Sequence, residues 1–102
     1  MEQMYHIFVE TPLGLRTGKM TFEVNDKKVN GRLEILGKTE QFEGMRKTDG
    51  EVEVTGSITL ATRKIWYKGK GTLEEERVEL ELEGGRNRLK LRGSRQKEEE
   101  EQ

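Results

Sequence analysis

Cysteine is absent from this chain of 102 residues, and proline, histidine and tryptophan each occur once. The absence of cysteine excludes disulfides, thiol nucleophiles and thiolate metal ligands. The single histidine, His6, has no nearby residues at the spacing of a metal site or a catalytic triad. Glutamate is plentiful, but it mostly alternates with apolar residues, as it does on the solvated face of a sheet. We therefore expect no catalytic residues, no metal and no cofactor, which argues against an enzyme.

An excess of charge of one sign is also missing, since 19 lysines and arginines balance 20 aspartates and glutamates. The net charge of -1 supplies no general attraction to nucleic acid or to an anionic membrane. The first residues lack the basic start and the apolar run of a signal peptide, and no stretch is apolar for long enough to span a membrane. We expect a cytoplasmic protein with no nucleic-acid partner and no membrane partner.

Glycine, by contrast, is abundant and regularly spaced. Five of the twelve glycines recur at intervals of 13, 13, 12 and 13 residues: Gly18, Gly31, Gly44, Gly56 and Gly69. Most of them share the two-residue phase of the neighbouring apolar side chains, so they lie within strands rather than between them. Glycine inside a strand marks a bend or a close approach of two backbones. We predict that Gly18, Gly31, Gly56 and Gly69 face the interior of a sheet that coils until it closes.

Alternation of apolar and polar residues dominates the chain and predicts eight strands. Their connections contain turn residues or are too short for a crossover helix, so consecutive strands should pair antiparallel in a meander. The predicted strands are Met4–Thr11, Leu15–Val24, Lys28–Leu36, Thr39–Met45, Glu51–Leu60, Lys64–Glu75, Arg77–Glu83 and Arg86–Gly93.

The last two strands allow a register to be predicted. A two-residue Gly84-Gly85 loop suits a type I′ turn, in which both central residues have positive φ. It would pair acidic with basic side chains in this order: Glu83 with Arg86, Glu81 with Arg88 and Glu79 with Lys90. The basic stripe of the last strand would then be largely neutralised, which argues against nucleic-acid binding.

The hairpin around Asp49 has two interpretations. A two-residue Asp49-Gly50 loop would expose Phe42. A three-residue loop that ends in a glycine bulge would instead align Phe42, Gly44 and Arg46 with the buried face of the next strand. We favour the second interpretation, which leaves Arg46 near one rim.

These patterns predict an all-β, single-domain fold: an eight-stranded antiparallel up-and-down β-barrel over residues 1–95, followed by a disordered acidic tail at 96–102. An open or split meander sheet that closes by dimerisation is the alternative. A barrel of eight strands is just wide enough to be filled by side chains or to hold one small ligand. The residues predicted to face inward are Tyr5, Ile7, Val9, Met20, Phe22, Val24, Val29, Leu33, Ile35, Phe42, Val52, Val54, Ile58, Leu60, Ile65, Tyr67, Leu73, Val78, Leu80, Leu82, Leu89 and Leu91.

The strand count, the meander order and the glycine spacing resemble the calycin class, which comprises lipocalin-type and avidin-type barrels. The resemblance implies a calycin-like architecture. The Gly-x-Trp motif that opens a lipocalin-type barrel is absent, and Trp66 falls in the sixth predicted strand. The resemblance therefore concerns the fold, and it implies no particular function.

Two hypotheses for function follow. The first is a binding barrel that takes a small apolar or aromatic ligand in its interior, at Tyr5, Phe22, Phe42, Tyr67, Gly31 and Gly69. The second is a structural or protein-interaction module with a filled core. Because the first strand is apolar on both sides and Trp66 has the outward phase, this hypothesis places a homodimer interface at Met4, Phe8 and Trp66.

Overall fold

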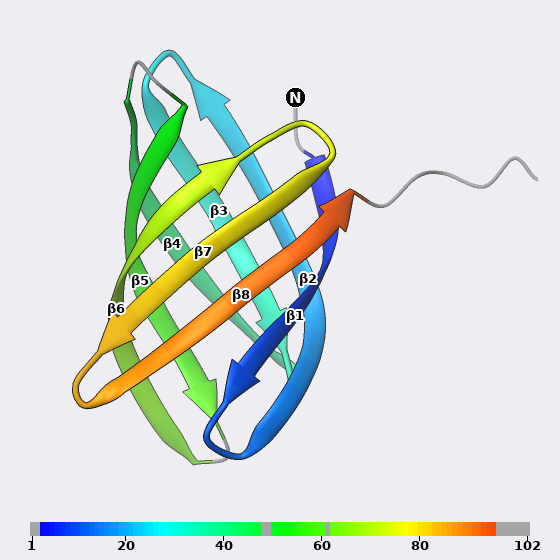
Figure 1. Ribbon diagram of the computed structural model, residues 1–102, viewed down its shortest axis with the longest axis vertical. Coiled ribbons are helices and arrows are strands. Elements are labelled where there is room, and N and C mark those ends of the chain that lie inside the picture. Colours follow the sequence, from blue (N-terminus) through cyan, green and yellow to red (C-terminus); the bar gives the residue numbers. More distant parts are fainter. Residues whose placement is uncertain (1–2, 48–49, 61, 96–102) are drawn as a thin grey trace, which may run out of the picture.

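The computed structural model describes residues 3–47, 50–60 and 62–95, and these form one closed barrel (Figure 1). Its strands are β1 (Gln3–Thr11), β2 (Gly14–Asn25), β3 (Lys28–Ile35), β4 (Lys38–Arg46), β5 (Glu51–Leu60), β6 (Arg63–Leu73), β7 (Arg77–Gly84) and β8 (Asn87–Arg95). Each strand pairs antiparallel with the next, and β1 also pairs with β8. The eight-stranded up-and-down barrel is confirmed, and the open-sheet alternative is wrong because the chain closes on itself. The predicted tail at 96–102 lies outside the described residues.

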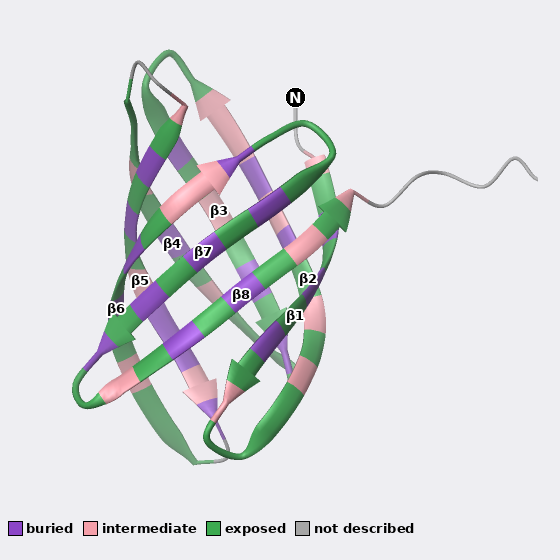
Figure 2. Cartoon of the chain, in the orientation of Figure 1, coloured by how far each residue is buried: buried purple, intermediate pink, exposed green. Residues whose placement is uncertain are grey.

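Buried and exposed residues alternate along the strands, which separates an apolar interior from a charged exterior (Figure 2). Every residue that was predicted to face inward belongs to one hydrophobic core or packs against it. Val24 and Ile65, near opposite ends of the barrel, are only partly buried, whereas the rest of the set is buried. The two-residue period alone therefore predicted the core, because a strand in a barrel has one inner and one outer side.

Inward glycines and large side chains alternate in rows that run around the barrel. One row crosses β2 to β6 in the order Phe22, Gly31, Phe42, Gly56 and Tyr67, each directly opposite the next. A Cβ atom added to Gly31 would lie 2.8 Å from Phe22 Cβ, and one added to Gly56 would lie 2.8 Å from the Tyr67 hydroxyl oxygen. Each aromatic side chain thus occupies the space that the neighbouring glycine leaves.

The other rows repeat this arrangement, with a glycine between two large apolar residues: Gly18 between Ile7 and Ile35, Gly44 between Val29 and Val54, and Gly69 between Val54 and Leu82. The prediction that Gly18, Gly31, Gly56 and Gly69 face the interior is confirmed, and Gly44 faces it too. Alternation of large side chains with glycine lets the eight strands coil tightly around a filled core.

The β4–β5 hairpin has the register that we favoured. The Lys47 amide donates a hydrogen bond to the Glu51 carbonyl at 2.7 Å, and Gly50 has a φ of 92°, as a glycine bulge at the end of a three-residue loop requires. Phe42 is consequently buried opposite Gly56. Residues 48–49 of the loop lie outside the described residues.

The predicted register of the last hairpin is wrong. Gly84 pairs with Asn87, so the turn is Gly85-Arg86 rather than Gly84-Gly85. Gly84 continues the inward phase of β7, and a Cβ atom there would lie 2.7 Å from Ile65 Cγ2, which explains why glycine is needed inside the strand. The register shifts by two residues, and acidic residues still face basic ones: Glu83 with Arg88, Glu81 with Lys90 and Glu79 with Arg92.

Candidate functional site

Tyr5 and Phe22, two of the residues predicted to bind a ligand, pack against each other inside the barrel. Their rings stack with centroids 5.2 Å apart and an interplanar angle of 11°. The Tyr5 hydroxyl oxygen lies 2.7 Å from Gln3 Oε1 and 2.8 Å from the carbonyl oxygen of Glu74, which follows β6. Burial raises the pKa of Tyr5, so the hydroxyl stays protonated and joins the first strand to the β6–β7 connection.

The other four predicted ligand residues, Phe42, Tyr67, Gly31 and Gly69, are also packed against their neighbours. A Cβ atom on Gly31 would lie 2.5 Å from Phe42 Cζ, and one on Gly69 would lie 2.7 Å from Leu82 Cδ2. Phe42 and Tyr67 are both buried. The inward glycines therefore allow close packing instead of leaving volume for a ligand. Binding of a small apolar compound in the interior stays a prediction, and this packing gives it no support.

The junction between β4 and β5 is where the barrel departs from regular pairing. The two strands pair only from Phe42–Gly56 to Arg46–Val52, although β4 begins at Lys38 and β5 continues to Leu60. We call the unpaired parts, residues 38–41 of β4 and 57–60 of β5, the β4–β5 seam. Side chains, rather than a main-chain ladder, connect the two strands along this seam.

Glu40 makes that connection. It shares the inward phase of its partner Leu33, yet its carboxylate lies in the seam. Ser57 Oγ donates to Glu40 Oε1 at 3.0 Å, and Thr59 Oγ1 donates to Glu40 Oε2 at 2.6 Å. Ser57 has the outward phase but is only 4% exposed. The hydrogen bonds from Thr59 and Ser57, together with the charge of Lys64, lower the pKa of Glu40 against the opposing effect of burial.

Lys64 and Trp66, on β6, complete a group of charged and aromatic side chains beside the seam. The ammonium nitrogen of Lys64 lies 4.0 Å from Glu40 Oε1 and 5.1 Å from the centroid of the Trp66 ring. Trp66 is opposite Ser57 in the β5–β6 ladder and is 68% exposed. The Lys64 ammonium therefore lies against both a carboxylate and the face of an indole, which is a cation–π geometry.

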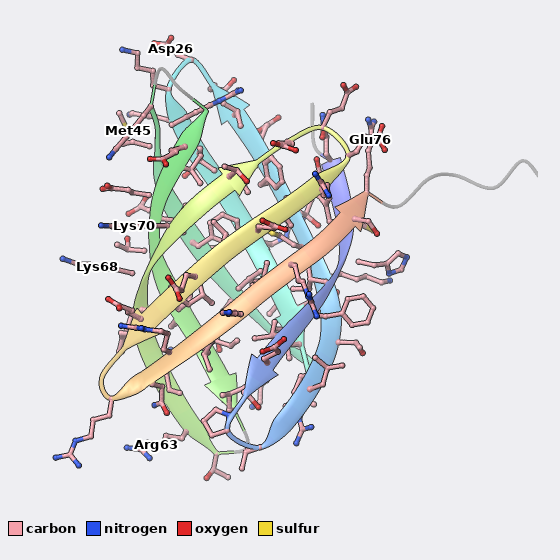
Figure 3. The ribbon with its side chains drawn as sticks, viewed as in Figure 1. Asp26, Met45, Arg63, Lys68, Lys70 and Glu76 are labelled. Carbon is pink, nitrogen blue, oxygen red and sulfur yellow. The ribbon has the colours of Figure 1, made fainter. Side chains whose placement is uncertain are left out.

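A groove of about 1030 Å³ runs over this group, and its lining residues come from β2 to β7. It is open to the exterior, and its lining includes Glu40, Lys64, Trp66 and Tyr67. Burial and the negative charge of Glu40 raise the pKa of Tyr67, so its hydroxyl remains protonated. Lys68 also lines the groove, and it projects from the outer surface of the barrel (Figure 3). The groove thus offers an aromatic face, a carboxylate and ammonium groups to a polar partner.

A second candidate surface lies on the outer side of the first three strands. We call it the outer apolar face, and it consists of side chains that are 43–56% exposed: Phe8, Leu13, Leu15 and Leu36. Phe8 is opposite Thr17 on β2, and Leu15 lies two residues before Thr17 on the same side of the strand. Leu36 directly follows β3, whose last residue is opposite Gly18. The ladders therefore gather these side chains near one end of β1–β3.

The predicted interface of Met4, Phe8 and Trp66 does not form a single surface. Met4 and Phe8 lie on the outer side of β1, whereas Trp66 lies on β6, and β7 and β8 separate these strands on the shorter way around the barrel. Alternation assigns a residue to the outer side but not to a position around the circumference. The exposed leucines were missed, although Leu13 and Leu36 lie in tight turns, where large apolar residues are unusual.

No family model and no curated protein matches the sequence. Within the described ranges, no helix is long and apolar enough to cross a membrane, and no group of three histidine or carboxylate side chains could hold a metal ion. Among solved structures, the chain is similar to a redesigned β-barrel, b11L5F_LGL, with a TM-score of 0.70 and 13% sequence identity. The similarity covers 93% of this chain and 90% of that chain, and at this identity it shows the fold alone.

Proposed function

We propose that this chain is a protein-interaction module with a filled core, and that it pairs with a second copy of itself through the outer apolar face. The observation that carries the proposal is the clustering of four half-exposed large side chains on the outer side of β1–β3. Single exposed apolar side chains are ordinary, whereas several of them gathered on one surface mark an interaction site. The rows in which glycines alternate with large side chains favour this module over a binding barrel, because the large side chains fill the space beside each inward glycine.

The charges around the outer apolar face suit a second copy of the same chain. Arg92 is opposite Phe8 on β8, and its Nη2 atom lies 3.6 Å from Glu10 Oε2 on β1. On the other side of the face, Lys19 of β2 is opposite Glu34 of β3. A two-fold axis through the face can bring the acidic groups of one copy to the basic groups of the other. The net charge of -1 causes little repulsion between the copies.

Light scattering coupled to size-exclusion chromatography tests the proposal. At millimolar concentration, the wild-type protein should have twice the 11.8 kDa mass of one chain. Leu15→Glu and Phe8→Glu should each give a single-chain mass, because each places a charge in the interface. Met45→Glu is the matched control, since Met45 is 51% exposed on β4, away from the face, and the charge change is the same.

Circular dichroism of each variant verifies that the barrel remains folded, which is expected because the substituted side chains are exposed. A wild-type mass of one chain at millimolar concentration would overturn the proposal. So would a dimer that Leu15→Glu and Phe8→Glu leave intact.

A further inference from the structure

The Lys64 ammonium occupies a position that has the features of a cation site. The Trp66 ring forms one wall, with its centroid 5.1 Å from Lys64 Nζ. The Glu40 carboxylate supplies the opposite charge, with Oε1 4.0 Å from the same nitrogen. Ser57 and Thr59 each donate to one Glu40 oxygen, which holds the carboxylate in place across the seam. A carboxylate accepts about four hydrogen bonds, so these two donors leave capacity on both oxygens. The site therefore combines a carboxylate that is held in place with an exposed indole, and it is filled by a side chain of the same chain.

We propose that Trp66 and Glu40 form a binding site for an ammonium group of a partner molecule, and that Lys64 is an internal occupant that the partner displaces. The site is independent of the outer apolar face, since it lies on β4–β6 rather than on β1–β3. The groove of about 1030 Å³ around it has room for the molecule that carries the ammonium group.

Three features make Lys64 a displaceable occupant. Its side chain is 51% exposed, so it can move into solvent without disturbing the core. Its distance of 4.0 Å from the carboxylate is too long for a direct hydrogen bond. Lysine also carries its charge on a flexible stem of four carbons, in contrast to the planar guanidinium of arginine. Glu40, by comparison, is only 17% exposed and is held by two hydroxyl groups, so the receiving side of the site stays in place.

Fluorescence of Trp66, the only tryptophan in the chain, reports directly on this site. The wild-type protein is titrated with n-butylammonium chloride at constant ionic strength, with sodium chloride as the blank. Lys64→Met keeps an apolar stem but removes the competing charge, so it should lower the Kd of butylammonium about threefold. Glu40→Gln should raise the Kd about threefold, because it removes the anion of the site.

Lys68→Met is the matched control for Lys64→Met. Lys68 lies on the same strand and lines the same groove, and its replacement changes the net charge equally, but it is not the residue that lies against the Trp66 ring. The inference is overturned if Lys64→Met and Lys68→Met change the Kd equally, which would indicate only a general electrostatic effect. It is also overturned if butylammonium leaves Trp66 fluorescence unchanged in both wild type and Lys64→Met. The Lys64→Met comparison remains decisive even where Glu40→Gln unfolds the protein.

A second titration distinguishes the source of the ammonium group. A Gly-Lys-Gly peptide with blocked ends carries the same ammonium on a polypeptide. A Kd well below that of butylammonium indicates that the groove also binds the peptide backbone. Equal values indicate that the ammonium group alone is recognised, and either result supports the site if Lys64→Met strengthens the binding.

Discussion

The two edges of β5 are held in different ways. On its β6 side, β5 pairs along its whole length, from Glu51 to Leu60. On its β4 side, it pairs only from Val52 to Gly56, and beyond that point the Glu40 carboxylate and two hydroxyl groups connect the strands. A main-chain ladder is available to almost any sequence, whereas the seam depends on particular side chains. The groove runs over the seam, and Lys64 reaches from β6 across β5 to the seam carboxylate of Glu40, so the irregular edge is the chemically distinctive one.

The largest expected effect comes from Gly56, where regular pairing with β4 ends. In Gly56→Ala the new Cβ atom would lie 2.8 Å from Gln41 O, from Phe42 Cβ and from the Tyr67 hydroxyl oxygen. We expect the free energy of unfolding to fall by about 3 kcal/mol, measured by urea denaturation. Thr55→Ala, at the exposed neighbouring position, should change it by less than about 0.5 kcal/mol. An equal loss of unfolding free energy in Gly56→Ala and Thr55→Ala would mean that the interior around Gly56 is not tightly packed.

Glu40→Ala tests the seam itself. Without the carboxylate, the buried Ser57 hydroxyl loses its acceptor, and we expect a loss of about 2 kcal/mol in the free energy of unfolding. Gln41→Ala, the exposed neighbour on β4, serves as the control and should have little effect. If Glu40→Ala were no more damaging than Gln41→Ala, the side chains would not hold the seam.

The pH dependence of stability isolates the charge of Glu40. Because its pKa is lowered in the folded protein, the charged form adds stability above the unfolded pKa near 4.5, and this stability is lost as the pH falls through the lowered folded pKa. The difference in unfolding free energy between wild type and Glu40→Gln should therefore be constant near neutral pH and should shrink below about pH 4.5. Urea titrations of both proteins from pH 7 to pH 3 measure this difference in unfolding free energy. A difference that grows on acidification would contradict the assigned direction.

The smallest effect is expected where the ladder is regular. Arg88 Nη2 lies 2.9 Å from Glu83 Oε2 across β7 and β8, and both side chains are well exposed. Glu83→Gln should change the unfolding free energy by less than about 0.5 kcal/mol, because exposed ion pairs contribute little and the main-chain bonds remain. A loss as large as that of Glu40→Ala would erase the distinction between the seam and the regular junctions.

Much of the fold could be predicted because a strand has only two sides. The period of two residues identified the inward set and the inward glycines, and the inward phase of Phe42 favoured the β4–β5 register that the structure has. The predicted register of the last hairpin was wrong because Gly84-Gly85 is also a good local turn signal. The choice between the two registers depends on Ile65, on a strand that is remote in sequence, which leaves no room for a side chain at position 84.

The candidate sites were predictable only in part, for the same reason. Trp66, Met4 and Phe8 were correctly placed on the outer side. Their separation around the barrel, and the placement of Phe8, Leu15 and Leu36 near one end of β1–β3, depend on the order and stagger of the strands. These relations arise only when the ends of the sheet join.

The sequence by itself determined which apolar residues face inward, how many strands form and that consecutive strands pair antiparallel, because these depend on the local period and on short connections. Only the tertiary structure decided that β1 closes on β8, that each inward glycine lies beside a large side chain, and that Glu40 reaches Ser57 and Thr59 across an incomplete junction. The physical reason is closure: the stagger of eight paired strands sets every cross-strand contact at once, and no single segment contains that information.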